Sequence, residues 1–412
     1  MPPVTDWKYS ATDLLTGAVL ADTLPLNVQS CGMTLNGSGT LTGSLNLSEV
    51  YESNAPFISA LMCRRAVIWA IADGWPVWAG VQWDWPDMTR AQGVLPISAQ
   101  TLDSLWSKRL ITDTLEYAGV DLYTAFLDLL AYGTTKDSFY IAGGGVSPAA
   151  TRPAGYLSMV ATQGRVARLL LPDPGSSGAT WTASYTYSDL TQVSSAWSDM
   201  CSSGNLEYAF VPGLDASGEL AIYLQLGYTQ LGRPLAGSGI KLTYPGNAID
   251  YGYTVTGSQS SNYVWATAPP NGAALQWQSE WPYGADLTDL LTNNYPLMES
   301  TASWQGSVVT TQSQINSFAD GQVAMTTAGM TTPVVNIGGS SQPRLQDIQL
   351  GDAAYLAFTS PLHPPQADGS PGLQQEVRII GWTAYPPGPQ QSEYYQVQTS
   401  AVSAGASGLT AG

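Results

Sequence analysis

Runs of hydrophobic residues recur along the chain at the length and spacing of short β-strands. Residues 40–48 alternate strictly between polar and small or apolar side chains, which is the period of a strand with one buried face. Residues 66–72 are apolar throughout, which predicts a strand covered on both faces. Asp73 and Gly74 then form a turn signal between this strand and the next apolar run, so a β-hairpin is expected here.

Two distant stretches of the chain share one pattern: an apolar strand, a strand with an internal glycine that ends in aromatic-proline, and a third alternating strand. The three strands are expected at 66–72, 77–86 and 94–99 in the first stretch, and at 353–358, 377–386 and 394–399 in the second. A glycine inside a strand indicates a bulge or bend of the kind that curls a sheet into a small barrel. The pattern predicts an internal duplication in which Gly80 and Gly381 occupy equivalent bends. Chance similarity between two β-meanders is the alternative.

Helical periodicity replaces the strand pattern in the middle of the chain. Residues 121–132 carry leucine and phenylalanine at helical spacing, with Asp121 placed to cap the first turn and Gly133 as the stop signal. A second helix is predicted at 188–203, with Ser188 as its cap. Helices beside strands in this order are typical of a compact α+β unit.

The whole chain is therefore predicted to be a β-rich α+β protein, with two small β-barrel domains flanking α+β domains. Its 412 residues are too many for one core, and several domains are expected. The predicted parts are a first β-barrel domain at 1–109, an α+β domain at 110–240 with a hairpin at 206–226, a second half at 241–400 with a helix near 313–325 and the second β-barrel, and a flexible Ala/Gly/Ser-rich tail at 401–412.

Composition adds that the surface carries few charges. Charged residues make up 11% of the chain, against roughly 25% in ordinary globular proteins. Such a surface is typical of subunits of a permanent assembly, because charge is depleted at buried interface cores, and extracellular β-proteins share it. The net charge of −17 argues against a sequence-independent grip on nucleic acid, which needs clustered Lys and Arg.

Neither a disulfide framework nor a membrane segment is expected. Cys31, Cys63 and Cys201 are odd in number and show no CxxC spacing, although one disulfide pair stays open. The first residues lack a basic region followed by an apolar one, so no secretory signal is predicted. The most apolar stretch, 66–81, is interrupted by a turn and is too short to cross a bilayer.

Catalytic constellations are weakly supported. His363 is the single histidine and lies in a proline-rich loop, so it cannot form a multi-histidine metal site, and no G-x-S-x-G motif supports a triad around it. No phosphate-binding glycine motif is present. Asp84, Asp87 and Glu280 have tryptophan neighbours that suit a sugar-binding face or a glycan hydrolase, but turn carboxylates and core- or interface-filling tryptophans are the preferred explanation. We expect no enzyme activity, no cofactor, and no catalytic, cofactor-binding or metal residue.

Three local patterns resemble one known family. The first is Leu24-Pro-Leu26, followed by an Asn-Gly turn and Trp78-Ala-Gly80. The second is Tyr244-Pro-Gly-Asn247, followed by Asn262-Tyr-Val-Trp-Ala266. The third is Gly351-Asp-Ala353, followed by the strand expected at 378–385. In their order and spacing over residues 1–400 they resemble the phage tail baseplate hub proteins, including the amino-terminal region of tail-associated lysins. The chain departs from the lysin-bearing members because no peptidase or muramidase region follows the second barrel.

This resemblance implies a structural virion component at the phage tail tip, synthesised in the host cytoplasm. The family forms a homotrimeric ring around the DNA channel, with neighbours that include a distal tail protein or the tail tube, the tape-measure protein, and tip or fibre proteins. DNA would pass through the channel without specific binding, and no membrane insertion is implied. A receptor- or glycan-binding minor tail protein is the alternative function.

Overall fold

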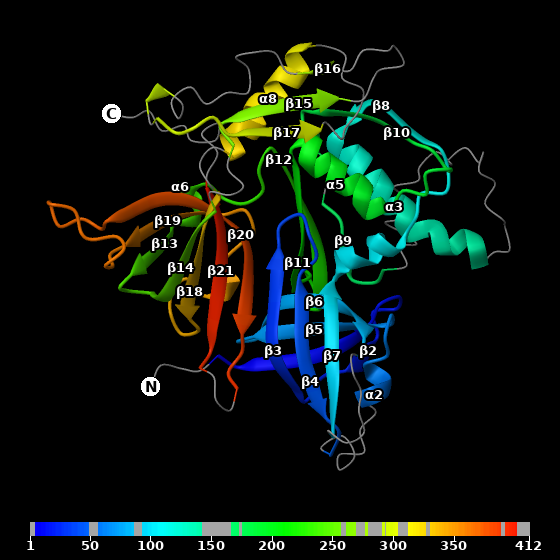
Figure 1. The fold of residues 1–412 in the computed structure, drawn as a ribbon. Coiled ribbons are helices and arrows are strands. Elements are labelled where there is room, and N and C mark those ends of the chain that lie inside the picture. The colour runs from blue at the N-terminus through cyan, green and yellow to red at the C-terminus, as the bar shows by residue number, and fades with distance from the viewer. Residues whose placement is uncertain are drawn as a thin grey trace.

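The computed structural model describes residues 5–48, 57–85, 93–141, 166–172, 175–256, 261–268, 277–278, 291–292, 294–303, 312–326, 330–388 and 392–401. Strands dominate these residues, as the predicted β-rich α+β class requires (Figure 1). Asp87, Glu280 and nearly all of the predicted tail at 401–412 lie outside the described residues. In the described part of the chain, no helix combines the length and apolar character needed to cross a membrane.

The first β-unit contains seven strands in the order β3-β4-β7-β6-β5-β1-β2, each antiparallel to its neighbours. Its strands are β1 (Trp7–Asp13), β2 (Val19–Ala21), β3 (Leu26–Thr34), β4 (Thr40–Asn46), β5 (Ala66–Ala72), β6 (Trp75–Asp84) and β7 (Val94–Thr101), with the short helix α2 (Phe57–Ala60) between β4 and β5. The hairpin predicted at Asp73 and Gly74 is confirmed, with Ala72 paired to Trp75.

The second β-unit contains six strands in the order β14-β18-β21-β20-β19-β13. They are β13 (Ile240–Tyr244), β14 (Ala248–Thr256), β18 (Met330–Gly338), β19 (Ala353–Phe358), β20 (Leu373–Tyr385) and β21 (Tyr394–Ala401). Neighbouring strands are antiparallel except for β13 and β19, which are parallel.

The two units repeat one strand order. In chain order, β1, β3, β4, β5, β6 and β7 of the first unit take the same places in their sheet as β13, β14, β18, β19, β20 and β21 take in theirs. The difference is the first strand, since β1 runs antiparallel to β5 whereas β13 runs parallel to β19. A shared order of six strands supports the predicted duplication, while closure of each sheet into a barrel remains a prediction.

The prediction that Gly80 and Gly381 occupy equivalent bends is wrong. Pairing of β20 with β21 skips Ile380, so Gly381 directly follows a bulge. Pairing of β6 with its neighbours is instead irregular at Val77 and Trp83, on either side of Gly80. A Cβ at Gly80 would lie 2.3 Å from the Gln100 carbonyl oxygen, so this glycine permits close packing of β6 against β7 rather than a bend.

The two units join through the last part of β20, beyond the residues that pair with β19. Strand β20 pairs antiparallel with β3, from Gly381 opposite Thr34 to Ala384 opposite Cys31, and so links both units into one sheet. One hydrophobic core, whose members run from Tyr9 to Val397, continues through both. In Figure 1 the first unit lies at the lower right and the second at the left. A second core lies in the middle of the chain, and the predicted division into domains stays a prediction.

The middle of the chain contains helices packed on a hairpin. Its elements are β8 (Leu115–Asp121), α3 (Leu122–Ile141), β9 (Leu169–Leu170), β10 (Thr180–Tyr185), α5 (Val193–Gly204), β11 (Leu206–Leu214), β12 (Leu220–Tyr228) and α6 (Leu235–Ser238), preceded by the 3-10 helix Leu102–Lys108. Between β14 and β18 the chain also forms β15 (Tyr263–Ala268), β16 (Trp277–Gln278), β17 (Glu299–Ser303) and α8 (Gln312–Thr326), which confirms the helix predicted near 313–325.

The helix caps confirm one prediction and correct two. Asp121 caps α3, because its Oδ1 accepts hydrogen bonds from the amides of Tyr123 (3.0 Å) and Thr124 (3.4 Å). The helix does not stop at Gly133, where a Cβ would lie 2.6 Å from the Trp106 ring, so this glycine admits the ring instead of ending the helix. Ser188 does not cap α5, which begins after Gln192.

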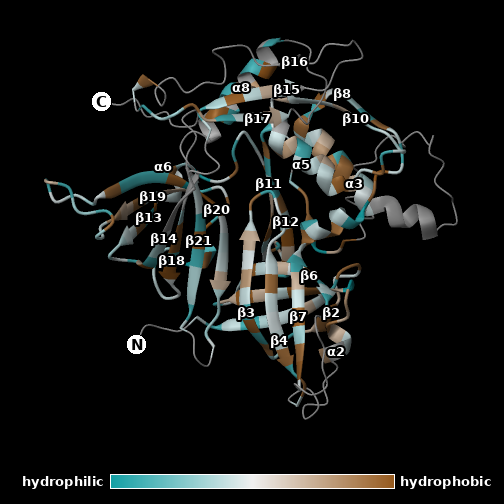
Figure 2. Ribbon diagram, viewed as in Figure 1, coloured by the Kyte–Doolittle hydropathy of each residue, from teal (hydrophilic) through white to brown (hydrophobic). Residues whose placement is uncertain are grey.

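Aromatic side chains form the centre of this middle segment. Trp197 of α5 lies between Phe126 of α3 (ring centroids 4.5 Å apart) and Trp106 (5.2 Å), and Tyr208 and Phe210 of β11 close the cluster. Figure 2 shows hydrophobic residues recurring along α3 and along the strands of the first unit. Burial of these rings anchors the helices to the β11–β12 hairpin.

Asp103 is a buried carboxyl between the first unit and the middle segment. Its Oδ2 accepts a hydrogen bond from Ser38 Oγ and its Oδ1 from Thr101 Oγ1, both at 2.6 Å. Burial raises the pKa of Asp103 above its usual range, against these hydrogen bonds, which lower it. The folded chain thus binds this proton more tightly than the unfolded chain does.

Asp103→Asn is expected to gain stability relative to the parent as the pH rises. In the parent, protonated Asp103 stabilises the folded state fully at a pH below the unfolded-state pKa of about 3.9. This stabilisation is lost as the pH rises through the folded-state pKa, which is higher. The neutral amide does not titrate, so the free energy of unfolding of the variant lacks this loss. Urea unfolding of both proteins from acid to neutral pH measures the difference, and a difference independent of pH would contradict this assignment.

Candidate functional site

A polar cleft of about 570 Å³ lies in the second unit, between β13 and the segment that leads from β18 to β19. Its lining residues are Arg233, Ser238, Gly239, Ile240, Lys241, Asn247, Gln342, Pro343, Gln346, Asp347 and Gln349. Asn247 ties the two walls together, because its Nδ2 donates to the carbonyl oxygens of Lys241 (2.8 Å) and Gln342 (2.7 Å). Asn247 Oδ1 accepts a hydrogen bond from the Thr243 backbone amide at 2.8 Å, so both polar atoms of this side chain hold the wall of the cleft in place.

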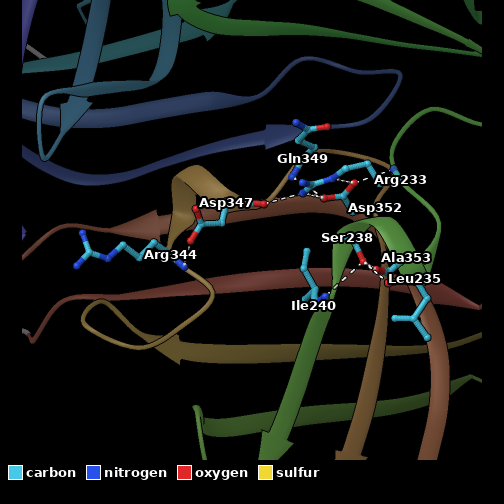
Figure 3. Close-up of polar contacts among 9 residues, drawn as sticks. All are labelled: Arg233, Leu235, Ser238, Ile240, Arg344, Asp347, Gln349, Asp352 and Ala353. Carbon is cyan, nitrogen blue, oxygen red and sulfur yellow. Dashed lines mark hydrogen bonds and ion pairs between the residues drawn. The ribbon is translucent and has the colours of Figure 1, made fainter.

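An ion pair forms the base of the cleft. Asp352 is fully buried, and its two oxygens accept hydrogen bonds from Arg233 Nε (3.1 Å) and Nη2 (2.6 Å) (Figure 3). The backbone amides of Arg233 and Gln349 also donate to this carboxylate, at 2.8 Å and 3.0 Å. The hydrogen bonds to Asp352 raise the pKa of Arg233, so the guanidinium stays charged.

Arg233 is thereby fixed in orientation. Its Nη2 additionally donates to the Asp347 carbonyl oxygen at 2.8 Å, while Nη1 makes no hydrogen bond within the described residues. The side chain keeps 38% of its surface exposed. A guanidinium locked on one side and open on the other is preorganised to bind a carboxylate or a carbonyl oxygen.

A short turn shapes the opposite wall. Ser238, the last residue of α6, donates from Oγ to the Ala353 carbonyl oxygen and accepts the Ile240 amide. Gly239 adopts a φ of +61°, which reverses the chain between α6 and β13 without the strain that a side chain would bring. The serine and this turn set where β13 starts beside β19.

A second ion pair stands behind the cleft and joins β11 to β20. Arg378 Nη1 and Nη2 donate to Glu207 Oε1 and Oε2, each at 2.7 Å, and both side chains are at most 14% exposed. Leu231 completes the network, because its amide donates to Glu207 Oε2 (2.6 Å) and its carbonyl oxygen accepts from Arg378 (3.1 Å). The bidentate geometry fixes the middle segment against the second unit.

Two glycines let the backbones cross at this junction. Gly232 and Gly351 both have a φ of +88°. A Cβ on Gly232 would lie 2.2 Å from the Gly351 carbonyl carbon, and a Cβ on Gly351 would lie 2.2 Å from the Leu231 carbonyl oxygen. Only glycine combines this conformation with this approach.

An apolar groove of about 380 Å³ adjoins the polar cleft and shares Gln346 and Gln349 with it. Val77, Leu350 and Trp382 are buried in its lining, and Trp75 is 45% exposed there. The groove lies where the first unit, the β11–β12 hairpin and the second unit meet, so both depressions mark the same junction.

The residues singled out by their chemistry in the sequence are not gathered at this junction. Asp84 is exposed at the end of β6, and His363 lies in the β19–β20 loop with its ring 6.2 Å from that of Tyr251. Cys31, Cys63 and Cys201 are free thiols. Among the described residues, no three His, Cys, Asp or Glu side chains converge as a metal site. The expected absence of catalytic, cofactor-binding and metal residues stays a prediction.

Sequence reasoning missed the ion pairs. Arg233 and Asp352 are 119 residues apart, and Glu207 and Arg378 are 171 apart, so no local pattern connects them. The sequence contains one signal for them: only 14 of its residues are Lys or Arg, so each basic side chain is a candidate for an ion pair with a distant carboxylate. Chemically, the junction offers fixed charges and amides for binding, and the carboxylates of Asp352 and Glu207 are held in ion pairs.

The chain is similar in structure to two solved tail proteins. A tail protein from Neisseria meningitidis MC58 is 12% identical, with 95% of this chain and 96% of that chain covered and a TM-score of 0.54. The 43 kDa tail protein of prophage MuSo2 from Shewanella oneidensis is 10% identical, with 96% and 98% covered and a TM-score of 0.53. No protein-family model and no curated protein sequence matches the chain. Over nearly its whole length the chain has the fold of these tail proteins, as the resemblance in the sequence predicted.

Proposed function

We propose that the chain is a structural subunit of a phage tail and forms the baseplate hub at the tail tip. The observation that supports this most is the repeat of one six-strand order within a chain that has the fold of tail proteins. A protein built from two similar units carries two similar surfaces. That property suits a subunit that must meet a partner of higher symmetry.

Three copies of the chain would place six similar units around one axis. A ring of this kind closes through head-to-tail contacts, in which each subunit uses two different surfaces. Because β20 pairs with β3, the two units of one copy are rigidly side by side, as neighbouring units of a ring need to be. The homotrimer would then present approximate six-fold symmetry to a six-fold tail tube.

The proposed neighbours follow from this position. The tube or a distal tail protein would bind above the ring, the tape-measure protein inside it, and tip or fibre proteins below. DNA would cross the channel without specific binding, because a chain of net charge −17 repels a polyanion. The protein would act in the virion, by assembly and without catalysis.

The mass of the purified protein in solution tests this proposal. Native mass spectrometry at micromolar concentration is expected to show a complex of three chains, which persists on dilution because ring contacts are cooperative. A chain that stays monomeric at every concentration, with its fold intact by circular dichroism, would contradict the ring. A dimer would contradict it equally, since two copies cannot supply six units.

A further inference from the structure

We propose that the polar cleft beside β13 binds an extended, acidic segment of another polypeptide. The inference deepens the proposed tail function, because a subunit of a permanent assembly is where such a segment would be found. Its ligand class, however, follows from the cleft alone. Arg233, Lys241 and three glutamines face the cleft, and each contributes a different part of the recognition.

The charge of the cleft is opposite to that of the chain. Acidic residues outnumber basic ones by 31 to 14 overall, yet two basic side chains, Arg233 and Lys241, line this one cleft. Asp347 is the single carboxylate among its described lining residues, and one of its oxygens accepts the Arg344 amide at 3.0 Å. Asp352 lies below Arg233 and offsets its charge, but it is fully buried and offers no oxygen to a ligand. The charged lining groups that a ligand meets are therefore two basic side chains and one carboxylate, an excess of one positive charge.

The basic groups are held in place before any ligand arrives. Arg233 is clamped by Asp352, and within the described part of the chain its Nη1 makes no hydrogen bond, so this group can donate to a second carboxylate. Lys241 Nζ lies 5.9 Å from the centroid of the Tyr355 ring, within cation–π distance. Because little side-chain freedom is lost on binding, these contacts favour the complex more than mobile surface charges would.

The amides select a polypeptide. Gln342, Gln346 and Gln349 are exposed along one wall, and no hydrogen bond of their side-chain amides is found among the described residues. A carboxamide both donates and accepts, which matches the alternating N–H and C=O groups of an extended backbone. An aromatic ring on which a sugar could stack is not found among the described residues that line the cleft. Nucleic acid would need a larger basic patch and would be repelled by the rest of the chain.

Fluorescence anisotropy with a fluorescein-labelled hexaglutamate peptide tests the proposal. The parent protein is expected to bind this probe, with an affinity that falls as salt is raised. The double variant Lys241→Glu/Gln346→Glu reverses the charge of the cleft at two exposed positions and should bind roughly tenfold more weakly. The matched control Lys108→Glu/Gln29→Glu changes the net charge equally, on exposed residues of the first unit and the 3-10 helix, and should bind as the parent does.

Several outcomes would overturn the proposal: equal affinity of the cleft variant and the control, equal binding of a labelled hexaglutamine peptide, no binding of hexaglutamate, or tighter binding of a labelled single-stranded oligonucleotide. The oligomeric state of the cleft variant distinguishes the sources of the segment. Smaller complexes would assign it to a second copy of this chain, and unchanged complexes to another tail protein. A monomeric parent that binds the probe would refute the ring and leave the cleft assignment standing.

Discussion

Gly351→Ala is expected to destabilise the protein by roughly 3 kcal/mol or more. The residue has a φ of +88°, and its Cβ would lie 2.2 Å from the Leu231 carbonyl oxygen and 2.6 Å from the Leu231 carbonyl carbon. Both contacts are to backbone, which cannot rotate away as a side chain can. The segment carrying Asp352, just before β19, would have to move away from Leu231, and both ion pairs of the junction would lengthen.

Gly239→Ala is the matched control for this substitution. Gly239 also has a positive φ, +61°, but a Cβ there would meet nothing within 4 Å. The loss of stability in Gly239→Ala therefore measures the conformational strain alone, which is about 1 kcal/mol. Urea unfolding followed by tryptophan fluorescence compares the two variants with the parent. Equal losses of stability in the two variants would show that the close crossing at Gly351 is not what this glycine provides.

Arg378→Met is expected to cost about 3–5 kcal/mol of unfolding free energy. The substitution leaves the Glu207 carboxylate 14% exposed, with the Leu231 amide as its remaining hydrogen-bond donor. The penalty is that of a desolvated and unpaired charge rather than that of a lost contact. Glu207→Gln in the Arg378→Met background removes the charge and should restore most of the loss.

Lys8→Met provides the comparison for an exposed pair. Lys8 Nζ lies 3.0 Å from Asp22 Oδ2, with side chains 42% and 82% exposed, so water screens the interaction. Its loss is expected to change stability by less than about 0.5 kcal/mol. Denaturation of the parent, Arg378→Met, Glu207→Gln and the double variant gives the coupling between Arg378 and Glu207 directly. A coupling as small as that of an exposed pair would mean that the junction is not held by this network.

Features that depend on residues close together in the chain were predictable from the sequence. Asp121 caps its helix, Asp73 and Gly74 form the hairpin, and the helix near 313–325 is present, because each depends on side chains only a few residues away. The two β-runs were recognised for the same reason. Their shared strand order gives this repeat a structural meaning that the residue pattern alone could not.

What escaped prediction depends on distant residues. Gly133 reads as a helix stop, yet it accommodates Trp106, which is 27 positions earlier in the printed sequence and reaches it through the fold. Gly80 reads as a bend, yet it makes room for the backbone of β7. The pairing of β3 with β20 joins segments more than three hundred residues apart, and the parallel pairing of β13 with β19 joins segments more than one hundred apart. The cleft beside β13 likewise combines distant segments, so it has no local signature in the sequence.

The central claim is that two similar units per chain build a ring with approximate six-fold symmetry from three copies. Electron microscopy of the purified protein tests it most directly. Class averages viewed along the axis are expected to show six lobes around an open channel. The symmetry should be three-fold rather than six-fold, because the insertion that contains β15, β16, β17 and α8 belongs to only the second β-unit of each chain. Particles without three-fold symmetry, or with the two β-units of each chain at different radii from the axis, would contradict it.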